Sequence, residues 1–230
     1  MGDIAAALHR VREKIREAER RFGRAPGSVQ LLAVSKTRPA TDIREAVAAG
    51  QRLFGESYLQ EALEKIQALD GEGLEWHYIG RIQSNKTRPI AEHFAWVHSL
   101  DSAKHARRLD AQRPPALPPL NVCLQVNIDR EQSKGGLAPA QVQALAQEIR
   151  RLPRLRLRGL MTLPAPRDGL EAQRRPFHTL GQLLQQLDDP GQPLDTLSMG
   201  MSGDLEAAIA EGATLVRVGT AIFGPRLPIT

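Results

Sequence analysis

The stretch Leu31-Leu32-Ala33-Val34-Ser35-Lys36-Thr37 decides how the rest of the chain is interpreted. Its first four residues form an apolar run without helical spacing, which is typical of a strand buried on both faces. The run leads into Lys36, and a charged amine beside a buried strand is costly unless it is paired or used chemically. Only six of the 31 basic residues are lysines, and lysine, unlike arginine, can form an imine. The position suggests a Schiff-base lysine, with a lysine that reaches past the strand end into solvent as the alternative.

Outward from this stretch, strand and helix patterns alternate along the chain. Segments with the character of strands are 31–35, 52–54, 76–79, 96–99, 120–128, 155–163, 196–198 and 215–218. All but the last are followed by helical patterns, at 40–48, from 57, 84–92, 101–112, 139–151, 169–187 and 204–211. Alternation in units of about 25 residues predicts a parallel sheet, and eight units predict a closed (β/α)8 TIM barrel that spans residues 1–230 as a single domain. An open nucleotide-binding sheet is the weaker alternative, because no glycine-rich phosphate loop follows any strand.

An additional helix is predicted at the N-terminus, over residues 3–22. Its apolar residues recur at alternating steps of four and three and form one stripe: Ile4, Leu8, Val11, Ile15, Ala18 and Phe22. We expect this helix to pack outside the barrel, near the place where an eighth helix would lie. Nothing beyond it resembles a heptad seam, so a monomer is expected.

The composition limits the cellular compartment and the class of binding partner that we expect. Apolar residues make up 41% and charged residues 25%, and no apolar run approaches the ~18–20 residues that span a bilayer. The N-terminus has no signal-peptide pattern, and Cys123 is the only cysteine, so a cytoplasmic protein without disulfides or membrane contact is predicted. The net charge of +5 suggests nucleic acid, but aromatic residues are only 4%, too few for a stacking surface. Sites for small anionic ligands explain the positive charge equally well.

Small and hydroxyl residues follow the last two predicted strands. Strand seven leads through the sequence Ser-Met-Gly-Met-Ser-Gly-Asp, residues 198–204, into a helix, which places Ser202 near a helix N-terminus. Strand eight ends in Gly219 and Thr220. In a closed ring these ends lie beside Lys36, where barrels commonly hold phosphate. Arg217 alternates with apolar neighbours and points either into the barrel mouth or into a salt bridge with Glu56 or Asp204.

Motifs across nearly the whole chain identify a family resemblance. They are LLAVSKT, FGE-SYLQE, WHYIGRIQSNK, VNID-REQSKGGL, RGLMTL, LSMGMSGDLEAAI and VRVGTAIFG. They resemble, in order, the motifs of the YggS/PROSC-type pyridoxal 5'-phosphate (PLP) homeostasis proteins, which are similar to the barrel of alanine racemase.

The resemblance implies a PLP fold type III barrel and a cofactor site. In that site Lys36 holds PLP as a Schiff base, and Ser202, Gly219 and Thr220 hold its phosphate. Arg217 faces the pyridine nitrogen, which keeps that nitrogen unprotonated and weakens the ring as an electron sink. The residue after Phe-Gly-Glu is also implied to contact the cofactor; the family usually has Asn there, whereas this chain has the shorter Ser57.

The sequence favours a carrier of PLP over an enzyme, with no catalytic residue assigned. Racemisation needs a second acid or base opposite the lysine, and in alanine racemase this is a tyrosine from a second domain of the partner. Because this chain ends at Thr230, soon after the last strand, we expect no such domain. The family resemblance implies a protein that binds PLP and can pass it to apo forms of PLP-dependent enzymes.

Two other functions remain open at this point. One is a PLP-dependent racemase or lyase that uses Tyr58, His77 or Cys123 as its acid. The other is a module that binds nucleic acid or a protein partner through its basic surface.

The other polar residues are interpreted as structural or surface residues without a functional role. His9, His93, His98, His105 and His178 lack metal-ligand spacing and are taken as surface or core-edge residues, so no metal is predicted. His77 is expected to be packed. Lys134 is expected to be a solvated loop lysine, with a role at the barrel mouth as the alternative.

Overall fold

Eight parallel strands form a closed barrel in sequential order in the computed structural model, which describes residues 3–131, 134–187, 189 and 191–225. The strands are β1 (Gln30–Val34), β2 (Leu53–Glu56), β3 (Glu75–Tyr78), β4 (Trp96–Leu100), β5 (Leu120–Gln125), β6 (Leu155–Met161), β7 (Thr196–Ser198) and β8 (Leu215–Val218). The ring closes where β1 pairs with β8, with Leu32 opposite Arg217. The predicted (β/α)8 barrel is confirmed; Ser133 and Thr230, used in the sequence argument, lie outside the described residues.

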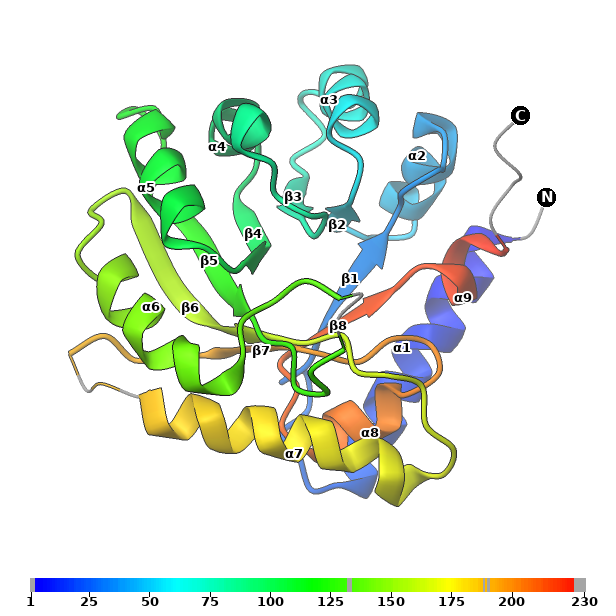
Figure 1. Cartoon of the computed structure of the whole chain (residues 1–230). Coiled ribbons are helices and arrows are strands. Elements are labelled where there is room, and N and C mark those ends of the chain that lie inside the picture. The colour runs from blue at the N-terminus through cyan, green and yellow to red at the C-terminus, as the bar shows by residue number, and fades with distance from the viewer. Residues whose placement is uncertain (1–2, 132–133, 188, 190, 226–230) are drawn as a thin grey trace.

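Helices surround the strands on all sides (Figure 1). They are α1 (Ile4–Arg21), α2 (Ala40–Ala48), α3 (Leu59–Ala68), α4 (Thr87–His93), α5 (Ala103–Gln112), α6 (Val142–Ile149), α7 (Leu170–Leu187), α8 (Leu205–Ala210) and α9 (Thr220–Phe223). Short 3-10 turns at Ser84–Lys86 and Pro139–Gln141 precede α4 and α6. These bounds follow the periodicity of apolar residues closely. Several helix starts differ from the expected ones by one to three residues, and the short helix α9 after β8 was not expected. Among these, α3 begins at Leu59 after Tyr58, so Ser57 lies outside the helix that it was expected to begin.

The first helix occupies the place predicted for it. Asp3 Oδ1 accepts a hydrogen bond from the Ala6 amide at 2.9 Å and caps α1. The apolar stripe of α1 is buried, and the helix packs against α2, α8 and α9, outside the seam between β1 and β8. Buried Glu19 accepts hydrogen bonds from the amides of Gly27 and Val29 and so fixes the entry into β1. The N-terminal helix therefore positions the first strand.

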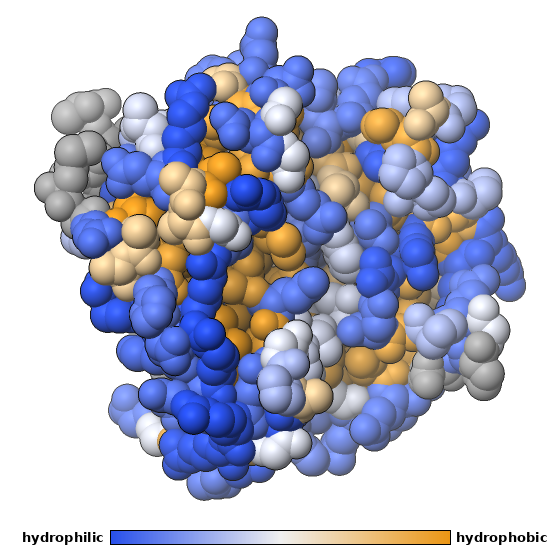
Figure 2. All heavy atoms as spheres, turned by 180° about the vertical axis from the view of Figure 1, so that it is seen from behind, coloured by the Kyte–Doolittle hydropathy of each residue, from blue (hydrophilic) through white to orange (hydrophobic). Residues whose placement is uncertain are grey.

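The outer surface is mainly polar. Seen from behind, hydrophilic side chains cover most of the molecule, and apolar atoms show mainly in hollows between them (Figure 2). Among the described residues, no helix combines the length and apolar character needed to cross a bilayer.

Replacing Leu8 with alanine tests whether α1 is an integral part of the fold. Leu8 is completely buried, so the Leu8→Ala variant is expected to lose about 2–5 kcal/mol of unfolding free energy through lost burial and a residual cavity. Urea denaturation measures this loss. The neighbouring exposed His9 provides the control, because His9→Ala removes no buried contact. Equal effects of the two substitutions would show that α1 contributes no core.

Candidate functional site

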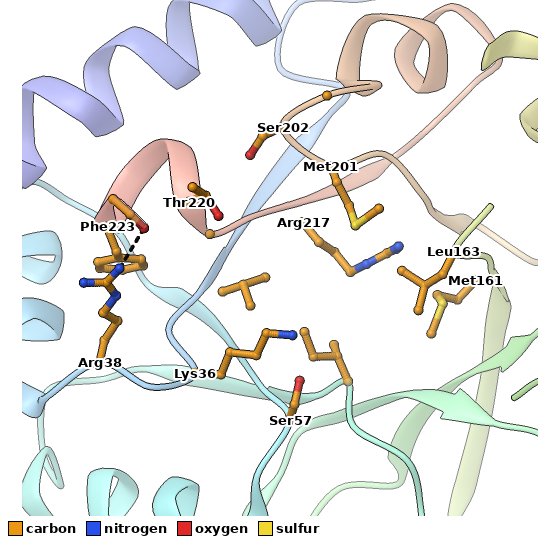
Figure 3. A pocket seen from close by; sticks show the side chains of 15 residues that line it. Lys36, Arg38, Ser57, Met161, Leu163, Met201, Ser202, Arg217, Thr220 and Phe223 are labelled. Atoms are coloured by element: carbon orange, nitrogen blue, oxygen red, sulfur yellow. Dashed lines mark hydrogen bonds between the residues drawn. The ribbon is translucent and has the colours of Figure 1, made fainter. Parts of the chain in front are cut away.

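A cavity of about 290 Å³ opens at the C-terminal ends of the strands. This is the end of the barrel where active sites of the fold lie, and the volume is near the lower limit for small-molecule pockets. The structure brings all of the sequence-predicted site residues together around this one cavity: Lys36, Ser57, Ser202, Arg217, Gly219 and Thr220. Figure 3 shows the Lys36 side chain reaching into it from one side, with Ser202 and Thr220 on the opposite side.

The charge of the cavity lining selects for an anion. Three cationic side chains line the cavity, those of Lys36, Arg38 and Arg217, and no carboxylate does so among the described residues. Hydroxyl groups are contributed by serine and threonine residues on the same walls. Cations and hydroxyl donors around a small cavity are the groups that bind phosphate or carboxylate.

Lys36 lies in a tight turn that ends β1. The Arg38 amide donates to the Ser35 carbonyl at 3.1 Å and closes this turn. Thr37 has φ of 63°, a left-handed conformation that a β-branched residue rarely adopts, so the turn is strained. Such strain persists only where the surroundings hold the backbone in place.

A buried ionic cluster provides that support. Lys65 Nζ on α3 donates to the Ser35 carbonyl at 2.7 Å and to Glu56 Oε1 at 2.8 Å, and it also pairs with Glu61. Glu56 accepts from the Ser35 hydroxyl at 2.6 Å, and Glu61 accepts from the Thr37 amide at 2.6 Å. Burial raises the pKa of Glu56, while Lys65 and the Ser35 hydroxyl act in the opposite direction. The residues on both sides of the candidate lysine are thus fixed by one cluster.

The opposite wall is formed by the segments that follow β7 and β8. Asp204, not Ser202, precedes the first residue of α8, and its carboxylate accepts from the Met201 amide at 2.6 Å. Asp204 therefore occupies the N-cap position suggested for Ser202, without a side-chain hydrogen bond to the helix, while Ser202 lines the cavity. Thr220 is the first residue of α9, after Gly219, where a side chain would crowd the Val34 carbonyl at 3.1 Å.

The Arg217 side chain extends from β8 into the cavity, and two of its guanidinium nitrogens form hydrogen bonds behind the cavity. Its Nη1 donates to Ser198 Oγ and its Nη2 to the Thr162 carbonyl, each at 2.8 Å. Among the described residues it forms no salt bridge with Glu56 or Asp204, the carboxylates considered from the sequence. Burial lowers the pKa of Arg217 to about 10, which leaves it cationic at neutral pH.

The sequence analysis missed a cationic residue of the cavity, Arg38, and misplaced one histidine. Arg38 lines the cavity and donates to the Gly224 carbonyl at 2.7 Å; the signal was its place four residues after the end of a buried strand. The interpretation of His98 as a surface or core-edge residue was wrong, because it is completely buried on β4. His98 instead bonds to His77 and Ser198 inside the barrel.

The three acids considered for a racemase lie elsewhere. Tyr58 is 49% exposed, His77 is buried inside the barrel, and burial raises the pKa of the Cys123 thiol to about 12. None of them lines the cavity. Lys134 is also absent from the lining, and it bonds to Glu131 at 2.8 Å and to the Leu163 carbonyl at 3.1 Å.

Removing Lys65 should destabilise the barrel strongly. The Lys65→Met variant leaves buried Glu56 without its cation, so a loss of about 3–5 kcal/mol of unfolding free energy is expected. Urea denaturation measures the loss, with the exposed Lys104→Met as control. The double variant Lys65→Met, Glu56→Leu should recover part of it, because the fully buried carboxylate is gone and only the partly exposed Glu61 loses its partner. A loss below about 1 kcal/mol for Lys65→Met would contradict the importance of this cluster.

The buried histidines predict a pH dependence of stability. Burial lowers the pKa of His77 and lowers that of His98 well below its ordinary value. Below about pH 6.5 the unfolded chain therefore binds protons that the folded barrel excludes, and stability falls by up to about 1.4 kcal/mol per pH unit for each histidine. Urea denaturation between pH 7.5 and 5.5 should show this decline. The slope should be smaller for His98→Gln; an unchanged slope would contradict the prediction.

Comparisons with known proteins point to one family. Residues 7–227 match the family model described as alanine racemase, N-terminal domain. A pyridoxal phosphate homeostasis protein of Pseudomonas aeruginosa is 59% identical over 226 residues, which cover 98% of this chain and 97% of that protein. The structure of PipY from Synechococcus elongatus with PLP bound matches with a TM-score of 0.82 at 40% identity, covering 96% of this chain and 100% of that one.

A more distant match supports the fold alone. An alanine racemase of Clostridium difficile has a TM-score of 0.73 at 15% identity, and the match covers 99% of this chain but 57% of the racemase. The identities and coverage, with the shared motifs, lead to one conclusion. The chain belongs to the alanine racemase N-terminal domain family and, within it, to the YggS/PROSC-type pyridoxal phosphate homeostasis proteins.

Proposed function

We propose that this protein binds PLP through Lys36 and acts in PLP homeostasis by holding and transferring the cofactor. The observation that carries the proposal is the single cavity in which a strand-end lysine, a buried arginine and two hydroxyl-bearing turns face one another. The names of the relatives support it, since the Pseudomonas aeruginosa protein is called a homeostasis protein and PipY was solved with PLP bound.

The donor set of the cavity fits the chemical groups of PLP. Bound PLP supplies an aldehyde, which a lysine amine captures reversibly. In this proposal Ser202, Thr220 and the backbone at Gly219 hold the phosphate, since hydroxyl groups and the first amides of helices bind such anions. Arg217 donates toward the ring nitrogen and keeps it without a proton. Ser57 contributes a hydroxyl beside Lys36.

The residues that line the cavity suit the binding and transfer of PLP better than catalysis of a reaction on it. Two-base chemistry needs an acid or base on the face of the cofactor opposite the lysine. Apart from Lys36, the titratable side chains on the described lining are Arg38 and Arg217, and arginine is a poor proton carrier. This favours a carrier without a reaction of its own.

The proposal also covers the compartment, the oligomeric state and the partners of the protein. We place the protein in the cytoplasm as a monomer, with apo forms of PLP-dependent enzymes as recipients and no nucleic-acid partner. The buried, unpaired Cys123 is consistent with a reducing compartment.

Visible absorption with borohydride reduction tests the attachment. The protein loaded with PLP is expected to be yellow, and reduction followed by peptide mapping should find the label on Lys36. The Lys36→Ala variant should lose the covalent label, whereas Lys104→Ala, at an exposed position, should keep it. A label on another amine, or no uptake of PLP, would contradict the proposal.

Exchange of the α-hydrogen of amino acids separates a carrier from an enzyme. We expect no exchange above the rate given by free PLP when several amino acids are incubated with the loaded protein. Exchange that depends on Lys36 would instead favour a racemase or lyase.

A further inference from the structure

Behind Arg217, a line of buried polar side chains crosses the interior of the barrel. Ser198 Oγ lies 2.8 Å from Arg217 Nη1 and 2.7 Å from His98 Nδ1. His98 Nε2 lies 2.8 Å from His77 Nδ1, and His77 Nε2 lies 2.9 Å from Glu75 Oε1. The two histidines and Ser198 are completely buried, whereas the Glu75 side chain is 45% exposed. The line therefore runs from the cavity to the N-terminal end of β3, on the far side of the barrel.

With both histidines neutral, the two ends of this line determine the direction of every hydrogen bond in it. A carboxylate only accepts, so His77 carries its proton on Nε2 and donates to Glu75. His77 Nδ1 then accepts from His98 Nε2–H, and His98 Nδ1 accepts the hydroxyl proton of Ser198. Because a guanidinium only donates, Ser198 accepts from Arg217. This is the only pattern with two neutral histidines that satisfies all four bonds.

The surroundings favour this neutral pattern. Burial lowers the pKa of both histidines, and the hydrogen bond from His77 lowers the pKa of Glu75. Trp96 stacks on His77 with ring centroids 5.4 Å apart, which shields the middle of the line from water. At the Glu75 end, Arg158, which pairs with Asp195, also lowers the pKa of Glu75.

At the cavity end the electrostatics leave Arg217 dependent on this line. Asp204 acts on Arg217 through space, and the Cys123 thiol lies nearby, but neither forms a hydrogen bond with it among the described residues. A buried guanidinium needs compensation, and hydrogen bonds in series between a cation and a carboxylate polarise one another. The line supplies an acceptor at Ser198 and a negative charge at its far end.

We propose that Ser198, His98, His77 and Glu75 act as positioning residues for Arg217, as a one-directional chain of hydrogen bonds that aims the guanidinium into the cavity and links it to a carboxylate on the opposite face of the barrel. The ligand-binding consequences rest on the proposed PLP function. The direction of the chain does not, so the two can be tested separately.

Nitrogen-15 NMR of ligand-free protein labelled at histidine tests the direction. The chain requires the Nε2–H tautomer at both His77 and His98, with no protonation of either between pH 8 and about 6. The exposed His9 provides the reference signal for an imidazole in contact with solvent. An Nδ1–H tautomer at either buried histidine, or a charged imidazole at neutral pH, would overturn the proposal whether or not the protein binds PLP.

Binding measurements test the consequence for Arg217. Ser198→Ala removes the acceptor of Arg217 Nη1 and is expected to weaken PLP binding about fivefold to tenfold, the effect of about one hydrogen bond. Ser198→Thr keeps the hydroxyl and should bind like the parent protein. In the proposed function phosphate binds the wall formed by Ser202 and Thr220, so inorganic phosphate should bind equally to all three proteins.

Glu75→Gln tests the far end of the chain. This variant keeps an acceptor oxygen for His77 but removes the charge, so the Nε2–H tautomers should persist while PLP binding weakens about twofold to fivefold. Glu72→Gln, at an exposed position shortly before β3, should leave binding unchanged. Thermal unfolding of each variant confirms that it is folded.

The results that would contradict this proposal differ from those that would contradict the proposed function. If Ser198→Ala and Glu75→Gln bind PLP as tightly as the parent protein, the chain does not position Arg217 and the proposal is wrong. If the parent protein fails to attach PLP at Lys36, the proposed function is wrong, and the NMR tautomers still decide whether the chain exists as described.

Discussion

The buried amine of Lys65 is the contact on which the rest of the site depends. It joins the Ser35 carbonyl to Glu56 and Glu61, and through them it holds the strained turn that carries Lys36. A buried ion pair is seldom more stabilising than an apolar pair of the same size. Its benefit here is positional, because an apolar contact could not bind the backbone on both sides of Lys36.

The anchoring of the turn that carries Lys36 also explains why the cavity has two different walls. Strands β1 and β2 with α3 present a rigid lysine, while the segments after β7 and β8 present hydroxyl groups and backbone amides. Because β1 pairs directly with β8, these walls face each other across a small cavity. This arrangement suits a ligand with an electrophilic end and an anionic end, which is the basis of the proposed PLP binding.

The fold could be predicted because its signals are local. The apolar runs at 31–35 and 215–218 and the helical stripe at 3–22 each reveal their own element, and eight repeats of one pattern leave little choice of topology. Lys36, Arg217 and the Gly219-Thr220 pair could be located because strand ends share one face of a barrel.

Other features could not be predicted because their partners are distant in the chain. His98 sits in an apolar run, and its acceptors and donors, His77 and Ser198, are 21 and 100 residues away. Ser57 and Ser202 were expected at the cavity, but the observed starts of α3 and α8, which leave both serines outside the helices, were not. The anchoring role of Lys65 is hidden for the same reason, since a helical lysine is ordinarily solvated.

The bond from Arg38 to the Gly224 carbonyl has a consequence for how the protein is made. It joins the turn after the first strand to the segment after α9, so the earliest and latest parts of the barrel meet at one point. A nascent chain on the ribosome exposes Lys36 long before the opposite wall of the cavity has been synthesised. The complete cavity therefore forms only after the final turn has been translated, and a chain released before residue 219 would carry Lys36 without Gly219 and Thr220.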